Sequence, residues 1–265
     1  MGASPGALNM LAVLAARELD EVRDVYTGWP IDVPMPGAES YIGDADPAAP
    51  ARDGPSAAIV HWMQQVSGTI RTIAGGQAVD TVPVTPIRLE YPGRGAGTAY
   101  TVGHPEPVTL WRSLPITGDA ACVMIVTPQL ASATDALRQA IDAGDLTVEQ
   151  AATRVSGGEP PPLTEATLAR YPTHGDLPTF FALARGLRQG REVSVGARVT
   201  DFPLGLPAAT GLPLVVALQQ LQDGRLSRPG VSPPERALDP DAFFADLMRL
   251  WRPGAPSVVV VDRSW

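Results

Sequence analysis

The sequence contains no lysine, because all 20 basic residues among its 265 are arginines. Lysine supplies the amine of Schiff-base enzymes and the phosphate-binding side chain of a Walker A loop. Both of those enzyme classes, and any enzyme with a lysine general base, are therefore excluded. Positive charge is scarce overall. The formal net charge of −8 argues against a nucleic-acid partner, since phosphate binding needs a surplus of basic side chains.

Cysteine is also nearly absent, with Cys122 as its one example. A single cysteine excludes an intrachain disulfide and a zinc cluster of several thiolates from this chain alone. Because Val123, Met124 and Ile125 follow it, we predict that Cys122 is a buried strand residue rather than a nucleophile.

Long hydrophobic runs are missing too. The longest, residues 8–16 and 211–218, are shorter than the roughly 18 to 20 residues of a membrane span. Residues 1–6 carry no basic cluster ahead of the first apolar stretch, which does not fit a secretory signal. We therefore expect a cytoplasmic globular protein with no membrane contact.

The spacing of apolar residues and of Pro and Gly predicts helices and strands along most of the chain. Helices are predicted for residues 7–22, 56–68, 212–222 and 239–251, and residues 129–190 also favour helix, including 180–187. Strands are predicted for residues 22–29, 70–74, 81–91, 98–102, 108–114, 121–126, 191–200 and 257–261. Residues 31–57 predict an irregular loop. Strands grouped between helices indicate an α+β fold with a mixed or antiparallel sheet flanked by helices.

Several motifs resemble one known family over nearly the whole chain, most weakly at residues 129–180. They are Pro5-Gly6-x-x-Asn9-x-Leu11-Ala12, Tyr91-Pro92-Gly93, Gly103-His104-Pro105-Glu106, Thr210-Gly211-x-Pro213, Leu221-x-x-Gly224, Gly230-Val231-x-x-Pro234-Glu235 and Asp239-Pro240-x-x-Phe243. In this order they resemble the C-terminal, substrate-binding half of saccharopine dehydrogenase-like reductases. As helix starts, helix stops and turns, they bear on fold more than on chemistry.

The resemblance implies a division of the chain. Residues 1–30 would form a crossover helix and strand, residues 58–205 the α+β domain for substrate binding and dimerisation, and residues 206–265 helices and a strand that pack on a nucleotide domain. It also implies a homodimer, in which strands 81–91 and 121–126 would otherwise expose an apolar face.

The family's dinucleotide-binding half, a strand, a glycine-rich turn and a helix, has no counterpart in this sequence. Residues 93–97 are rich in glycine but lie between strand-like segments with no helix after them, so we do not predict nucleotide binding there. We expect no cofactor bound by this chain alone, and NAD(P) only if a separate Rossmann-domain polypeptide supplies its site. Whether the chain is naturally short or a fragment is left open.

The resemblance therefore implies the substrate-binding half of an NAD(P)-dependent oxidoreductase that acts on a small anionic substrate similar to an amino acid or keto acid. The alternative is a cofactor-free scaffold of the same fold, either a binding or assembly subunit or a non-redox enzyme of bacterial specialised metabolism.

Three arginines, Arg88, Arg94 and Arg112, are candidates for binding a substrate carboxylate, because a guanidinium donates two parallel hydrogen bonds to it. Solvated strand charges or structural ion pairs are the alternative for each.

For proton transfer the best candidate is His104, because histidine as a residue type titrates near neutral pH and the flanking Gly and Pro fix a turn that can present it. Glu106 would orient it. His61 and His174 are weaker candidates. No two histidines have a zinc-ligand spacing, so a metal site would need distant segments, and we predict none.

Overall fold

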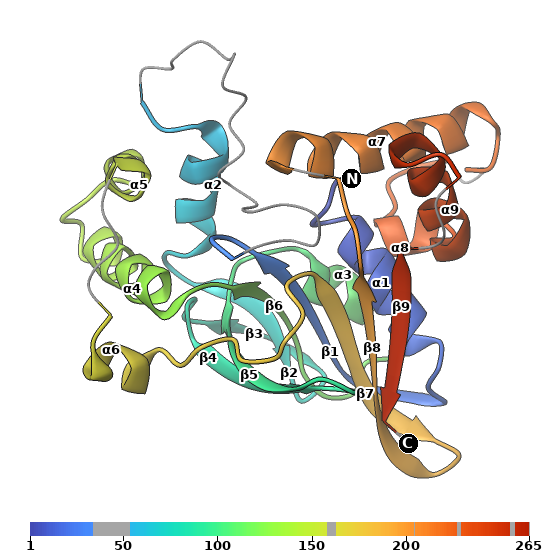
Figure 1. Ribbon diagram of the computed structural model, residues 1–265, viewed down its shortest axis with the longest axis horizontal. Helices are drawn as coiled ribbons and strands as arrows, with labels where there is room; N and C mark the ends of the chain where they lie inside the picture. The colour runs from blue at the N-terminus through green and yellow to red at the C-terminus, as the bar shows by residue number, and fades with distance from the viewer. Residues whose placement is uncertain (34–53, 158–162, 204, 227–228, 255–257, 265) are drawn as a thin grey trace.

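The computed structural model describes residues 1–33, 54–157, 163–203, 205–226, 229–254 and 258–264. Within them, nine strands form one mixed, mostly antiparallel sheet, and helices flank it (Figure 1). The predicted α+β class is confirmed. No helix in these ranges is both long enough and apolar enough to cross a membrane.

The sheet carries its strands in the order β3-β2-β6-β1-β7-β8-β9, with β5 also paired to β6 and β4 paired to β5. Only the β1–β6 pair is parallel. The strands are β1 (Glu21–Pro30), β2 (Ile70–Ala74), β3 (Gln77–Thr81), β4 (Pro86–Tyr91), β5 (Gly95–Thr101), β6 (Ala120–Ile125), β7 (Phe181–Arg188), β8 (Arg191–Val199) and β9 (Val259–Ser264).

The helices gather in two groups on either side of Figure 1. One group holds α1 (Ala7–Ala16), α7 (Gly205–Gln222), α8 (Pro234–Ala237) and α9 (Pro240–Trp251). The other holds α2 (Ala57–Gln65), α4 (Pro128–Asp142), α5 (Val148–Gly157) and α6 (Glu165–Arg170), while α3 (Glu106–Ser113) lies over the sheet. Side-chain caps begin several of them, such as Ser56 before α2 and Asp239 before α9. The capping box between Thr147 and Gln150, at the start of α5, is also present.

Side chains on a strand alternate between the two faces of the sheet, and around β6 both faces are buried. In β6, Cys122 and Met124 enter the larger core under the helices, whereas Val123 and Ile125 enter a smaller core. Leu89 and its neighbours in the β4–β5 hairpin cover that smaller core. Cys122 is therefore a buried strand residue, as predicted. Other parts of the chain cover residues 121–126. These residues therefore do not form the exposed apolar face that was given as a reason for dimerisation, and that reason is wrong.

Residues 108–114 do not form the predicted strand. They belong to α3, which begins at Glu106 with Pro107 in its first turn, a favoured position for proline. The strand prediction rested on Val108 and Thr109, which favour strands. Packing can outweigh such intrinsic propensity, and it does so here. Leu110 is 1% exposed and packs in the larger core, where α3 contacts β2 and β6.

Residues 180–187 do not form the predicted helix either, because β7 occupies Phe181–Arg188 between β1 and β8. A short apolar run fits a buried strand and a buried helix equally well. Glycine at position 186 lets β7 approach β1 closely, because a Cβ atom there would lie 1.9 Å from the carbonyl oxygen of Glu21 on β1.

Other differences concern boundaries. The helix predicted for 7–22 ends at Ala16, and the strand predicted for 81–91 is divided between the end of β3 and β4. The helix α7 starts earlier than residue 212. Of the loop predicted for 31–57, residues 34–53 lie outside the described ranges, as does residue 257 of the last predicted strand.

Candidate functional site

A cavity of about 1170 Å³ lies where α2, β2, α3 and the start of α7 meet. No aspartate or glutamate is among the described residues that line it, whereas His61, Arg71 and His104 are. The rest of the lining is apolar or neutral: Ser4, Pro5, Trp29, Ser56, Ala58, Ile59, Trp62, Gln64, Gln65, Thr69, Ile70, Gly103, Pro105, Val108, Thr109, Pro207 and Thr210.

A polar cluster of Ser4, His104 and Glu106 lies at the cavity, whose wall includes Ser4 and His104 but not Glu106. The Oγ of Ser4 lies 3.0 Å from Nδ1 of His104 and donates a hydrogen bond to Oε1 of Glu106. Nδ1 of His104 also lies 3.2 Å from Oε2 of Glu106. The His104 side chain is 8% exposed and that of Glu106 is fully buried. The cluster thus joins the chain before α1 to the segment that begins α3.

Local structure fixes the position of His104. The backbone N–H of Gly103 donates to the carbonyl oxygen of Gln65 at the end of α2, with a distance of 2.8 Å. A Cβ atom at Gly103 would lie 2.7 Å from Cγ2 of Ile70, so a larger residue would push α2 and β2 away. Trp29 packs against the imidazole ring as well, with its ring centroid 5.3 Å from that of His104.

The surroundings of Glu106 favour its ionised form. Burial raises the pKa of its carboxyl group, but the charge and hydrogen bond of His104 and the hydrogen bond from Ser4 outweigh burial, so the pKa is lowered overall. Glu106 is also the first residue of α3, where the positive end of the helix dipole favours negative charge.

The hydrogen bonds assign the tautomer of His104. Since Ser4 donates its hydroxyl proton to Glu106, neither group offers Nδ1 a proton, and Nδ1 must carry its own. The neutral ring then has its lone pair on Nε2. That atom makes no hydrogen bond to any residue in the described ranges, so it is the ring nitrogen open to a ligand of the cavity.

Cys122 lies behind this cluster. Its Sγ and the ligand atoms of His104 and Glu106 all lie within 4.8 Å of one another, so the three could hold a metal ion such as zinc. Cys122 comes from β6, whereas His104 and Glu106 lie two residues apart at the start of α3. Burial and the charge of Glu106 raise the pKa of the Cys122 thiol well above its ordinary value, and the other two groups are hydrogen-bonded to each other. The observed geometry is that of a hydrogen-bonded cluster, and we assign no metal-dependent reaction to it.

The three predicted carboxylate-binding arginines are elsewhere. Arg88 is exposed on β4, Arg94 donates to the carbonyl oxygen of Asp176 from the β4–β5 turn, and Arg112 is exposed on α3. None of them is among the described residues that line the cavity. The structure therefore does not bring them to His104, and their role as substrate ligands stays a prediction.

Of the weaker candidates, His61 lines the cavity and hydrogen-bonds to Gln65, while His174 does not line it. Sequence reasoning missed Ser4 and Arg71. Arg71 lines the cavity from β2 and forms a 2.8 Å ion pair with Asp80. The only signal for Ser4 was its place beside the Pro5-Gly6 motif.

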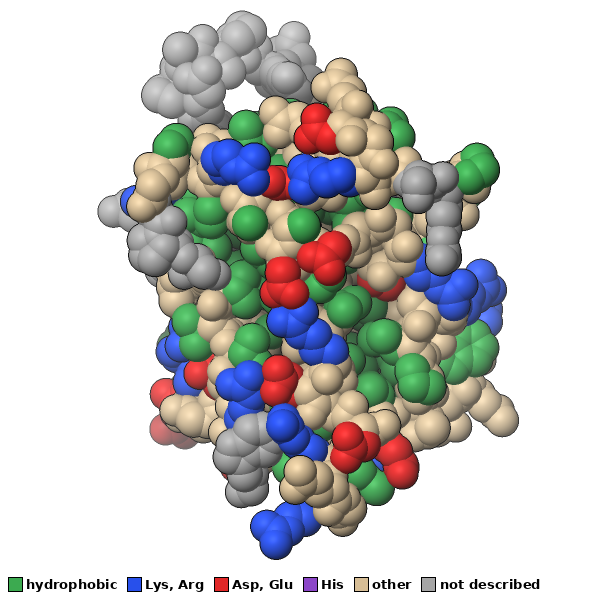
Figure 2. Space-filling model, turned by 90° about the vertical axis from the view of Figure 1, so that its right-hand side faces the viewer, with side chains coloured by type: hydrophobic (Ala, Val, Ile, Leu, Met, Phe, Trp, Pro, Cys, Tyr) green, Lys and Arg blue, Asp and Glu red, His purple; other side chains and the backbone are tan. Residues whose placement is uncertain are grey.

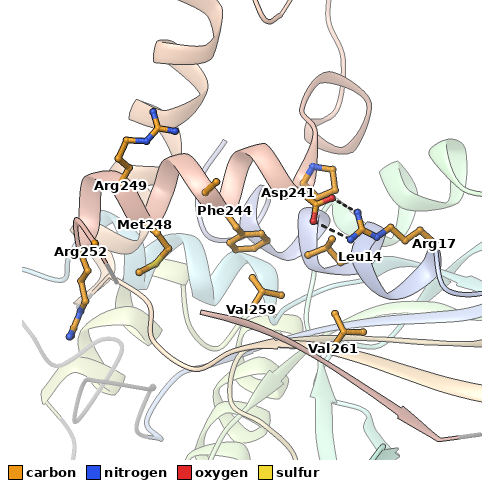
Figure 3. Close-up of a pocket in the computed structure, with 12 residues that line it drawn as sticks. Leu14, Arg17, Asp241, Phe244, Met248, Arg249, Arg252, Val259 and Val261 are labelled. Carbon is orange, nitrogen blue, oxygen red and sulfur yellow. Dashed lines mark hydrogen bonds and ion pairs between the residues drawn. The ribbon is translucent and has the colours of Figure 1, made fainter. Parts of the chain in front are cut away.

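A second hollow, of about 570 Å³, lies between α1, α9 and β9. Figure 3 shows apolar side chains turned into the gap between α9 and β9: Leu14, Phe244, Met248, Val259 and Val261. Its charged groups are already paired, since Arg17 binds Asp241, and Arg249 and Arg252 each bind an aspartate. Figure 2 shows basic and acidic side chains side by side on one face of the molecule. This hollow offers less chemistry than the cavity at His104.

The glycine-rich residues 93–97 do not have the surroundings of a dinucleotide site. Residues 93–97 form the turn of the β4–β5 hairpin and the start of β5, so their glycines lead into a strand. Pyrophosphate binding in this class of reductase uses a glycine turn at a helix N-terminus. We derive no step through this cofactor.

Neither a family model nor a curated protein sequence matches the chain. The resemblance to saccharopine dehydrogenase-like reductases thus stands on the motif residues alone.

Proposed function

We propose that this chain is the substrate-binding part of an oxidoreductase that acts on an amino-acid or keto-acid-like carboxylate, with a separate polypeptide supplying the nucleotide site. One observation carries the proposal: Ser4 and His104, which line the large cavity, form a hydrogen-bonded cluster with the buried Glu106, and no described lining residue is acidic. The motifs that resemble the reductase family support the reaction class.

His104 is the proton-transfer group in this proposal. Its neutral ring presents Nε2 as a base, and Glu106 stabilises the imidazolium that forms when Nε2 takes a proton. Ser4 holds Glu106 in place, and the hydrogen bond from its hydroxyl stabilises the buried charge of the carboxylate. Glu106 and Ser4 are positioning residues, since they act through Nδ1, the nitrogen opposite the one open to the cavity.

The lining also favours an anion. His61, Arg71 and His104 are its charged or titratable members within the described residues. A carboxylate would find imidazole and guanidinium donors in this lining, where Arg71 is held by its ion pair with Asp80. This supports an acidic substrate without naming one.

The test combines binding and turnover. The chain is titrated with a panel of 2-amino and 2-oxo acids, and then assayed for NADPH oxidation together with any dinucleotide-binding protein that is found to be encoded beside it. We expect turnover only with both proteins. His104→Gln should lower the rate by roughly 10²- to 10⁴-fold, the usual contribution of general acid–base catalysis. His174→Gln, which alters a histidine outside the cavity, is the matched control and should leave the rate unchanged.

Binding of these acids without hydride transfer in any combination would contradict the redox part of the proposal. It would favour the cofactor-free scaffold in its place.

A further inference from the structure

The outer side of α7 is an exposed apolar surface. Four of its side chains are between 40% and 55% exposed: Leu214, Val215, Leu218 and Leu221. The inner side of the helix is covered, and Ala209 and Val216 there are fully buried. In Figure 1, α7 lies at the top of the helix group that also holds α1, α8 and α9. A helix that is apolar all round normally has neighbours all round, so the outer side of α7 calls for a partner from another chain.

The residues on this side have the spacing of a seam between two helices. Gly211, Leu214, Leu218 and Leu221 follow one another at intervals of three, four and three residues. A stripe with this alternation packs against a second helix, because the side chains of each helix fill the gaps between those of the other. The spacing therefore favours a helix as the partner, rather than the flat face of a sheet.

The seam is complementary to itself when two copies run antiparallel. Residue 216 is the midpoint of both 214–218 and 211–221, so a two-fold axis at its level places Leu214 opposite Leu218 of the partner subunit. The same axis places Gly211 opposite Leu221 of the partner subunit. A Cβ atom at Gly211 would have nothing within 4 Å, so there is room for the leucine opposite it. A closed two-fold pair of this kind is the commonest arrangement of oligomers.

The charge of the surface also fits a second copy. The chain carries a formal net charge of −8, yet α7, Gly205–Gln222, contains no charged residue. Two copies of an acidic protein repel each other, and an uncharged contact surface lets them meet without burying like charges. The antiparallel arrangement also brings the N-terminus of each α7 towards the C-terminus of the other, where the partial charges of the two helix ends attract.

We propose that this chain forms a two-fold homodimer in which the outer side of α7 packs antiparallel on α7 of a second copy. With 18 residues, α7 is about 27 Å long. Two such faces in contact would bury on the order of 1,000 Å² in total, near the lower limit of a specific interface. We therefore expect a reversible dimer that is populated at micromolar concentration. The proposal does not depend on the proposed function, and it assigns the dimer contact to a helix in place of the sheet.

Analytical ultracentrifugation of the full chain over a concentration series measures the association. Leu218→Glu should weaken it roughly a hundredfold or more, because each copy would bury a carboxylate near the centre of the contact. Val82→Glu is the matched control, since Val82 is 49% exposed and Leu218 is 50% exposed, but Val82 lies between β3 and β4. It should leave the dimer unchanged. Both positions are exposed, so circular dichroism should show the wild-type fold in both variants.

A pair of variants tests the antiparallel register. Leu214→Arg and Leu218→Glu should each be monomeric alone. Mixed in equal amounts they should form a heterodimer, because the introduced arginine of one copy would lie opposite the introduced glutamate of the other. A parallel register would place position 214 opposite position 214, and the mixture would then stay monomeric.

Four results would overturn the proposal. They are a wild-type chain that is monomeric throughout the micromolar range, a dimer that Leu218→Glu leaves intact, a dimer that Val82→Glu dissociates, and a mixture of Leu214→Arg with Leu218→Glu that stays monomeric. If α7 binds a different polypeptide in place of a second copy, the first of these results is expected. None of the four bears on the role of His104, so the proposed function is tested separately.

Discussion

Replacing Glu106 by glutamine tests the central cluster of the site. The substitution keeps an acceptor oxygen and nearly the same shape but removes a charge that is fully buried. The hydrogen bonds from Ser4 and His104 then change from charge-assisted to neutral. A hydrogen bond to a charged group contributes about 1.5–3 kcal/mol and a neutral one about 0.5–1.5 kcal/mol. Over two bonds, we expect the free energy of unfolding to fall by about 2 kcal/mol.

The pH dependence of this loss follows from the sign of the pKa shift. The pKa of Glu106 is lower in the folded chain than its ordinary value. Its charge therefore contributes stability that is fully present above the unfolded-state pKa and is lost as the pH falls through the folded-state pKa. The difference between wild type and Glu106→Gln should accordingly vanish in acid.

Urea denaturation at neutral pH and at successively lower pH measures both quantities. Glu165→Gln, an exposed position on α6, is the control and should change stability little. Equal stability of wild type and Glu106→Gln at neutral pH would refute the reasoning, as would a difference that persists unchanged in acid.

Other expectations have simple measurements. Cys122 should resist a thiol reagent until the chain is unfolded, because burial and Glu106 raise its pKa; rapid reaction of the native chain would contradict this. Asp135→Ala should lower the free energy of unfolding by about 2 kcal/mol, since it leaves the buried hydroxyl of Tyr171 without its acceptor and removes one of the two ion pairs of Arg138; a urea titration that shows no change would count against it. The chain alone should bind neither NADH nor NADPH in titration calorimetry, where a dissociation constant in the low micromolar range would disprove the expectation. Light scattering should show a dimer, and a strict monomer at micromolar concentration would refute that prediction.

The sequence predicted an element correctly where the signals for it lie within its own segment. The helix α9 begins at a capping aspartate, Asp239, followed by Pro240, and both signals are visible in the sequence. Strand β6 is a short apolar run bounded by turn residues, and its burial on both faces follows from that composition. The α+β class follows from the order of such elements.

Elements whose identity depends on neighbours were predicted wrongly. Segment 108–114 has strand-forming residues but is helical because Leu110 packs in the core beneath α3. Segment 180–187 has helix-compatible residues but is a strand because β1 and β8 lie on either side of it. In both cases the competing conformations are close in intrinsic preference, so packing decides between them.

For the site, the sequence by itself determined that His104 and Glu106 lie two residues apart in a Gly-Pro turn, and that lysine chemistry is absent. Only the tertiary structure decided that Ser4, about a hundred residues earlier, joins them, that Cys122 lies behind them, and that Arg88, Arg94 and Arg112 do not line the cavity. The physical reason is that a hydrogen bond of about 3 Å depends on the folded path of the whole chain, whereas residue type and spacing report on a few neighbouring residues.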